Sequence, residues 1–112
     1  MPQPISVNEA IGQAASHAGE VVVVEGVLNF EFEDISLRHY PVSERRDDGY
    51  GSAIWLSVGI GSIQLNEPVL ERWSGKRVVV TGTIHGPSAG FGGCGHGSLF
   101  PAEILVASIE RP

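Results

Sequence analysis

The stretch that decides the fold is WSGKRVVVTGTIH at residues 73–85, because its second half alternates in the manner of a half-buried strand. Valine, threonine and isoleucine dominate that half, and these residues favour strands. Side chains alternate between the two faces of a strand. We therefore predict a strand over 76–85, with one face made by Val78, Val80 and Ile84.

The loop that follows this strand is rich in glycine. It reads GPSAGFGGCGHG at 86–97 and holds the only cysteine, Cys94, two residues before His96. The apolar segment EILVASI at 103–109 then predicts a last strand over 102–109. Because glycine allows close approach to the backbone, the loop is a candidate site for a ligand.

The N-terminal segment carries the signals of a helix. Ser6 and Glu9 have the spacing of a capping box, in which each residue satisfies a backbone N–H of the other. Gly19 supplies a stop. We predict a helix over about 7–18. Its apolar stripe follows a helical period and comprises Val7, Ala10, Ile11, Ala14, Ala15 and Ala18.

Between these segments lie three further strand patterns and a second helix. The apolar run EVVVVEGVLNFEF at 20–32 predicts a strand, with a bulge or sharp coil at Gly26. Alternation predicts a second strand over 35–40, and apolar residues predict a third over 52–60. Proline in the first turn and a following glycine predict a short helix over 67–73.

The order of these elements matches an OB-fold, a five-stranded Greek-key barrel with a helix between the third and fourth strands. The phrase GKRVVVTGTI also resembles the fourth strand of small bacterial OB-fold domains, in which V-x-V-x-G-x-I recurs. The resemblance is topological and covers about residues 20–110. We predict a mainly β, single OB-like domain over 1–112, with 1–19 as a helical extension that closes one barrel end.

The predicted core consists of the apolar residues on the inward faces of these elements. It comprises Val23, Val27, Leu28, Ile54, Leu56, Val58, Leu70, Val78, Val80, Ile84, Ile104, Val106 and Ile109.

Charge is unevenly distributed along the chain, whose 112 residues carry a formal net charge of −6. Residues 1–50 hold nine acids and three bases, which is the whole of the −6, whereas 51–112 hold four of each. Residues 20–37 contain five acids and no base. Such a field repels phosphate backbones and attracts cationic partners, although it is also typical of a solvated surface.

Several classes of protein are disfavoured by the sequence. No apolar run approaches the roughly 18 residues of a membrane-spanning helix, and the first residues do not read as a signal peptide. A single cysteine fits a reducing compartment, so we predict a cytoplasmic protein. Neither G-x-S-x-G nor H-E-x-x-H is present, and we expect neither catalysis nor a cofactor.

A metal site is a secondary hypothesis. Imidazole and thiolate are ligands of zinc, and His85, Cys94 and His96 surround one loop, with His39 as a conceivable fourth ligand. The spacing C-x-H is not a common zinc pattern. In the simpler interpretation Cys94 is a small buried hydrophobe and His96 caps a backbone group.

The glycine loop also spells G-x-G-x-x-G at 90–95, but no helix follows it, so we reject a dinucleotide site. A backbone nest for an anion remains open. Single-stranded nucleic acid is the familiar ligand of the fold, yet aromatic residues are few and the local basic cluster of Arg72, Lys76 and Arg77 follows the short helix.

The remaining hypothesis is a non-enzymatic binding module for a basic protein. In general character the chain resembles small bacterial immunity proteins, which bind and inhibit toxins. The alternative is an OB module that binds single-stranded nucleic acid or a small ligand through the 86–101 loop. The predicted partner-binding residues are Glu25, Glu31, Glu33 and Asp34, with Tyr40, Tyr50 and Phe91 as anchors.

Overall fold

The computed structural model describes residues 4–14, 16–31, 34–40, 42–45, 52–57, 67–86 and 100–111. These residues form six strands, two α-helices and one 3-10 turn. In chain order they are β1 (Ile5–Ser6), α1 (Val7–Gln13), β2 (Val21–Glu31), β3 (Asp34–Arg38), η1 (Val42–Glu44), β4 (Ala53–Ser57), α2 (Glu67–Trp73), β5 (Arg77–His85) and β6 (Glu103–Glu110).

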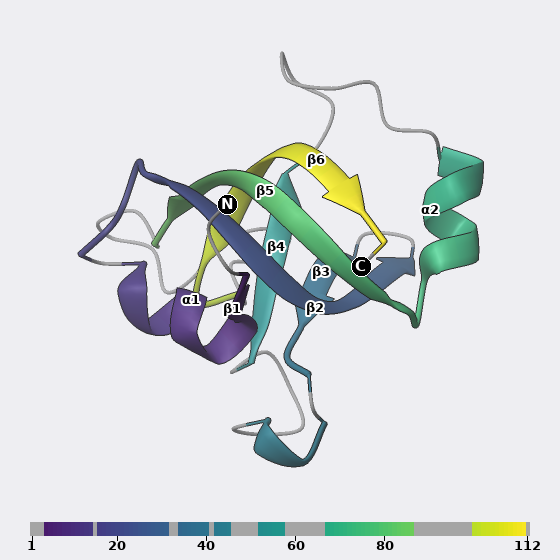
Figure 1. Ribbon diagram of the computed structural model, residues 1–112, viewed down its shortest axis with the longest axis horizontal. Coiled ribbons are helices and arrows are strands. Elements are labelled where there is room, and N and C mark those ends of the chain that lie inside the picture. The colour runs from purple at the N-terminus through teal and green to yellow at the C-terminus, as the bar shows by residue number, and fades with distance from the viewer. Residues whose placement is uncertain are drawn as a thin grey trace.

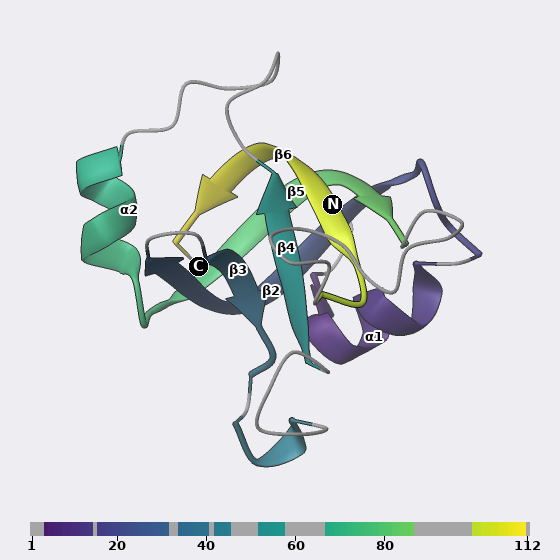
Figure 2. The same cartoon turned by 180° about the vertical axis from the view of Figure 1, so that it is seen from behind.

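Five of the strands close into a barrel (Figures 1 and 2). Neighbouring strands follow the order β2–β3–β4–β6–β5, and β5 pairs back onto β2. Only the β4–β6 pairing is parallel within this ring. The predicted OB-like barrel, with a short helix before its fourth strand, is therefore confirmed. The two-residue β1, which pairs in parallel with β2, was not predicted.

Strand β2 pairs with two neighbouring strands, and Gly26, near the point where the two ladders meet, packs closely against Arg38 and Val7. Its first part pairs with β5 and its last part with β3, and Val27 belongs to both ladders. A Cβ at Gly26 would lie 2.6 Å from the carbonyl oxygen of Arg38 and 2.9 Å from Cγ2 of Val7. The ladder with β5 runs through Gly26 in continuous register, so no bulge lies there in that ladder.

The irregularity in register lies instead between β5 and β6. Gly82 is opposite Val106 and Thr81 is opposite Ser108, which leaves Ala107 as the extra residue of a bulge. A Cβ at Gly82 would lie only 2.2 Å from the carbonyl oxygen of Leu105. Glycine is therefore required at this position, because the backbone of β6 occupies the space of a Cβ.

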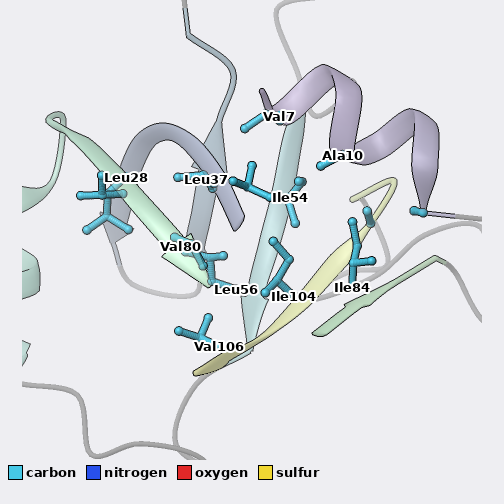
Figure 3. Packing of buried hydrophobic residues seen from close by; sticks show 14 of the residues in the cluster. Val7, Ala10, Leu28, Leu37, Ile54, Leu56, Val80, Ile84, Ile104 and Val106 are labelled. Carbon is cyan, nitrogen blue, oxygen red and sulfur yellow. The ribbon is translucent and has the colours of Figure 1, made fainter. Parts of the chain in front are cut away.

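The core fills the barrel (Figure 3). The helices α1 and α2 lie on opposite sides of the molecule (Figure 1), and both contribute residues to the core cluster. Val7 and Ala10 of α1 point into the same cluster as the strand residues, as expected for a helix that closes the barrel. Nine predicted core residues are buried, namely Leu28, Ile54, Leu56, Leu70, Val78, Val80, Ile84, Ile104 and Val106. Ile109 is partly buried against the core, and Val58 lies outside the described residues.

Two predicted core residues were wrong. Val23 and Val27 are only half-buried, and Val24 takes the inward position in the same phase as Gly26 and Leu28. Residues 21–24 are all valine, so the sequence shows no alternation there. Pairing with β5 decides the phase, because it opposes Val24 to the buried Val80.

Helix α1 begins as predicted and ends earlier. The backbone N–H of Glu9 donates to Oγ of Ser6 at 3.2 Å, while the Ser6 hydroxyl donates to the Glu9 carboxylate at 3.3 Å. The helix ends at Gln13, with Ala14 as its C-cap, and a turn follows. In this turn the backbone N–H groups of Ser16 and His17 and the Ser16 hydroxyl all donate to the carbonyl of Gln13. Gly19 then takes a positive φ of 87°.

Candidate partner-binding site

The hairpin formed by β2 and β3 pairs two of the predicted acidic residues in its backbone register. The ladder ends with Glu31 opposite Asp34, directly after the pair Phe30 and Ile35. Glu33, the third acidic residue predicted in this segment, lies outside the described residues. Like charges at directly opposed positions of a hairpin are unfavourable by themselves. The register therefore places two acidic residues of the sequence at directly paired positions at the end of this ladder.

The backbone behind the hairpin tip is held by the segment after α2. The N–H of Phe30 donates to Oγ of Ser74 at 3.0 Å, and the N–H of Gly75 donates to the carbonyl of Leu28 at 2.7 Å. Gly75 has a φ of 84°, a conformation that glycine adopts readily. These bonds fix the end of β2, so the opposed acids stand on a supported strand.

A second group of site residues lies on the outer side of the barrel, around Arg77. The Arg77 guanidinium donates from Nη2 to both carboxylate oxygens of Glu25, at 2.7 and 3.0 Å. Its central carbon lies 4.3 Å from the ring centroid of Tyr40, which is a cation–π contact. We call Glu25, Tyr40 and Arg77 the arginine cluster.

The arginine cluster changes the roles expected for two predicted residues. Glu25 is paired with Arg77, so its charge is largely balanced and contributes little to the acidic field. Tyr40 remains 43% exposed while its ring is held by Arg77. An exposed aromatic ring held in place costs less conformational entropy on binding, which suits an anchor.

The predicted partner-binding residues therefore occupy two described places. Glu31 and Asp34 lie at the hairpin tip, and Glu25 and Tyr40 belong to the arginine cluster. Tyr50 and Phe91 lie outside the described residues. Sequence analysis missed the role of Arg77, which it treated only as part of a basic group after the short helix. No local sequence pattern indicates this contact, because Arg77 and Glu25 are brought together only by the pairing of β2 with β5.

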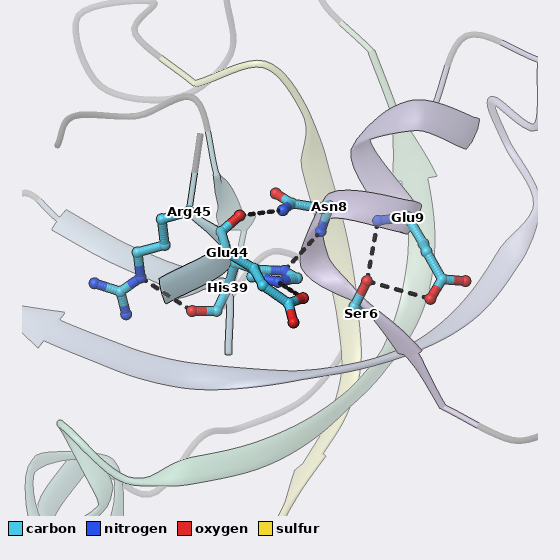
Figure 4. A network of polar contacts seen from close by, with 6 residues as sticks. All are labelled: Ser6, Asn8, Glu9, His39, Glu44 and Arg45. Atoms are coloured by element: carbon cyan, nitrogen blue, oxygen red, sulfur yellow. Dashed lines mark hydrogen bonds and ion pairs between the residues drawn. The ribbon is translucent and has the colours of Figure 1, made fainter. Parts of the chain in front are cut away.

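The buried side chain of His39 joins a polar network between α1 and η1 (Figure 4). Its Nδ1 accepts from the backbone N–H of Asn8 at 3.1 Å, so the ring proton is assigned to Nε2, which donates to Glu44 at 3.2 Å. The Asn8 amide donates to the carbonyl of Glu44 at 2.8 Å, and Nε of Arg45 donates to the carbonyl of His39 at 3.0 Å.

This network gives His39 a structural role. Both ring nitrogens are engaged within the chain, so His39 does not serve as the fourth metal ligand that the sequence suggested. Of the other proposed ligands, His85 is half-buried at the end of β5, and Cys94 and His96 lie outside the described residues. Within the described residues, no three His, Cys, Asp or Glu side chains form a group that could hold a metal ion.

The outer face of β3 and β4 is the face on which OB domains bind single strands. Here Ala53 and Phe100 are buried together, and Trp55 packs against them. The rings of Trp55 and Phe100 have centroids 5.4 Å apart and are tilted by 51°. The aromatic ring on this face is thus engaged in packing, whereas a stacking platform needs exposed rings.

The two site regions offer ion pairing, hydrogen bonding and aromatic contact, through paired acidic positions, a tyrosine and an arginine.

None of the described helices has the length and apolar character needed to cross a membrane. No protein-family model, no curated protein and no solved structure matches the chain.

Proposed function

We propose that this protein is a non-enzymatic binding module whose partner is a basic protein. The observation that carries the proposal is the register of the β2–β3 hairpin, which sets Glu31 directly opposite Asp34. Such a pair is unfavourable in isolation and favourable beside lysine or arginine. A net charge of −6 adds a long-range field that speeds the encounter with a cationic surface.

The hairpin tip and the arginine cluster can serve one interface. Tyr40 follows Asp34 by six residues, which corresponds to about 20 Å of extended chain. A standard interface covers about 800 Å² per partner, a patch wide enough to include both regions. In this arrangement the acids direct the approach, and Tyr40 supplies apolar contact area.

In its acidic charge and its exposed tyrosine, the chain resembles small bacterial immunity proteins, which neutralise basic toxins. Inhibition of a toxin-like enzyme and a cytoplasmic location therefore belong to the proposal, and the single cysteine fits a reducing compartment. A toxin-like protein encoded beside this one would supply the partner directly.

The test compares two doubly neutralised variants against a lysine-rich peptide of about 12 residues at low salt. Glu31→Gln with Asp34→Asn removes the opposed acids, and Glu71→Gln with Glu110→Gln removes the same charge from two exposed residues on other elements. We expect the hairpin variant to lose clearly more affinity and association rate in stopped-flow fluorescence. Equal losses would show that only net charge matters and would contradict the proposal.

The rival function is binding of single-stranded nucleic acid or a small ligand through the 86–101 loop. A fluorescence-anisotropy titration with oligonucleotides of about 12 nucleotides at low salt separates it, because OB modules that bind single strands use sites of roughly this size. We expect no saturable binding. A micromolar or tighter complex would replace the proposed function.

A further inference from the structure

Two of the most exposed apolar side chains stand in one row across three strands. Among the described residues the exposed large hydrophobics are Val21 at 70%, Leu105 at 45% and Tyr40 at 43%. Val21 of β2 is opposite Thr83 of β5, and Thr83 is opposite Leu105 of β6. We call Val21, Thr83 and Leu105 the apolar row.

The apolar row lies on the outside of the barrel. Ile84, which follows Thr83 on β5, is buried in the core. Ile104 and Val106, which flank Leu105 on β6, are buried there too. Side chains alternate between the faces of a strand, so Thr83 and Leu105 point outward. Neighbouring strands are about 4.8 Å apart, so Val21 and Leu105 stand about 10 Å from each other. Exposed apolar area of this kind marks a site of contact when it is grouped.

The charges around the apolar row are acidic. Glu20 is exposed and precedes Val21, where it pairs with His17, and Glu103 lies on the same face of β6 as Leu105. The described neighbours of the apolar row on that face include no lysine or arginine; they are Val23, Ser57, Thr81, His85, Glu103 and Ala107. A second copy of the chain would bring acid against acid, so the surroundings favour a cationic occupant.

We propose that the apolar row binds a segment of the partner that carries apolar side chains flanked by lysine or arginine. The choice of a basic occupant rests on the proposed function; the place of contact rests on the row itself. A helix fits the spacing, because residues seven apart on one helix lie about 10.5 Å apart along its axis. Val21 and Leu105 would contact two such side chains.

The test uses a leucine–lysine peptide of about 14 residues with leucines at helical spacing, and a shuffled peptide of the same composition as its control. Amide chemical shifts of the protein locate each peptide by NMR. We expect the patterned peptide to shift Val21, Thr83 and Leu105. Val21→Ser with Leu105→Ser should weaken it at least about fivefold, and Ser43→Ala, at an exposed residue of η1, by less than about twofold.

The outcomes separate this inference from the proposed function. If both peptides bind equally and change only the amide chemical shifts of the hairpin tip, the apolar row has no role in binding. The proposed function, binding of a basic protein, would then still hold. If neither peptide binds at low salt, both proposals fail. If sedimentation reveals a dimer that Val21→Ser with Leu105→Ser dissociates, a second copy occupies the row and this inference is overturned. A loss of binding on Tyr40→Ser alone would move the contact to the arginine cluster.

Discussion

At the scale of single residues, the glycines in the strands are set by the space around them. Gly82 faces the carbonyl of Leu105 at a distance that no Cβ tolerates, whereas nothing lies within 4 Å of a Cβ placed at Gly12 of α1. The two positions therefore respond to alanine in opposite ways, although sequence alone gives them the same residue.

We expect Gly82→Ala to lower the free energy of unfolding by about 2 kcal/mol or more, because backbone must shift to admit the methyl group. Gly12→Ala should raise it by about 0.5–1 kcal/mol through helix propensity. Urea denaturation of the two variants measures both. A Gly82→Ala variant within about 0.5 kcal/mol of the parent would contradict the close approach.

His39 is the residue on which the contact between α1 and the segment after β3 depends. His39→Ala should lower the free energy of unfolding by about 2–4 kcal/mol, because it leaves a cavity and removes two partly buried hydrogen bonds. His39→Asn keeps an acceptor near the Asn8 N–H, so it should lose less. Equal stability of the alanine variant and the parent, measured by denaturation, would show that the network contributes nothing.

At the scale of elements, β2 sets the inner and outer faces of the barrel wall. Its valine run carries no alternation, and the ladder with β5 turns Val24 inward and leaves Val23 half-buried. The same register directs Val21 and Glu25 outward, where they belong to the apolar row and the arginine cluster. A shift by one residue would exchange the core and both surface regions.

Val24→Ala should therefore destabilise the protein by about 2 kcal/mol, and Val23→Ala by less than about 1 kcal/mol. The two substitutions are chemically identical and adjacent, so each is the control for the other in thermal or urea denaturation. A larger loss of stability for Val23→Ala than for Val24→Ala would mean that Val23, and not Val24, faces the core.

At the scale of the whole molecule, charge acts over distances longer than any contact. Because acids predominate in the first half of the chain, association with a basic partner should slow as salt screens the field. Lys76 is exposed, and its backbone carbonyl accepts from the N–H of Leu28 near the hairpin tip.

Lys76→Gln makes the net charge more negative, so it should speed association with a lysine-rich peptide, the opposite of the effect of neutralising the hairpin acids. Glu71→Gln, on the nearby helix α2, is the matched control and should slow it. Association rates measured between low and physiological ionic strength decide the matter. Rates that do not change with salt would exclude electrostatic steering.

The sequence by itself determined the elements and their order, because these depend on neighbours along the chain. Alternation placed Val78, Val80 and Ile84 inward, and Ser6 with Glu9 marked the start of α1; the structure confirms both. Barrel topology followed from the order, since few folds accommodate it. For the candidate site, the sequence located the acidic segment and Tyr40 but not their surroundings.

Only the tertiary structure decided the phase of β2, the bulge at Ala107 and the pairing of Glu25 with Arg77. Each depends on which strand lies beside which: β2 and β5 are 52 residues apart at Glu25 and Arg77, and β5 and β6 are 24 residues apart at Gly82 and Val106. The valine run satisfies either face locally, and one phase is selected because it brings Val24 to Val80. The outward placement of Val21 and the arginine cluster follows from that same long-range contact.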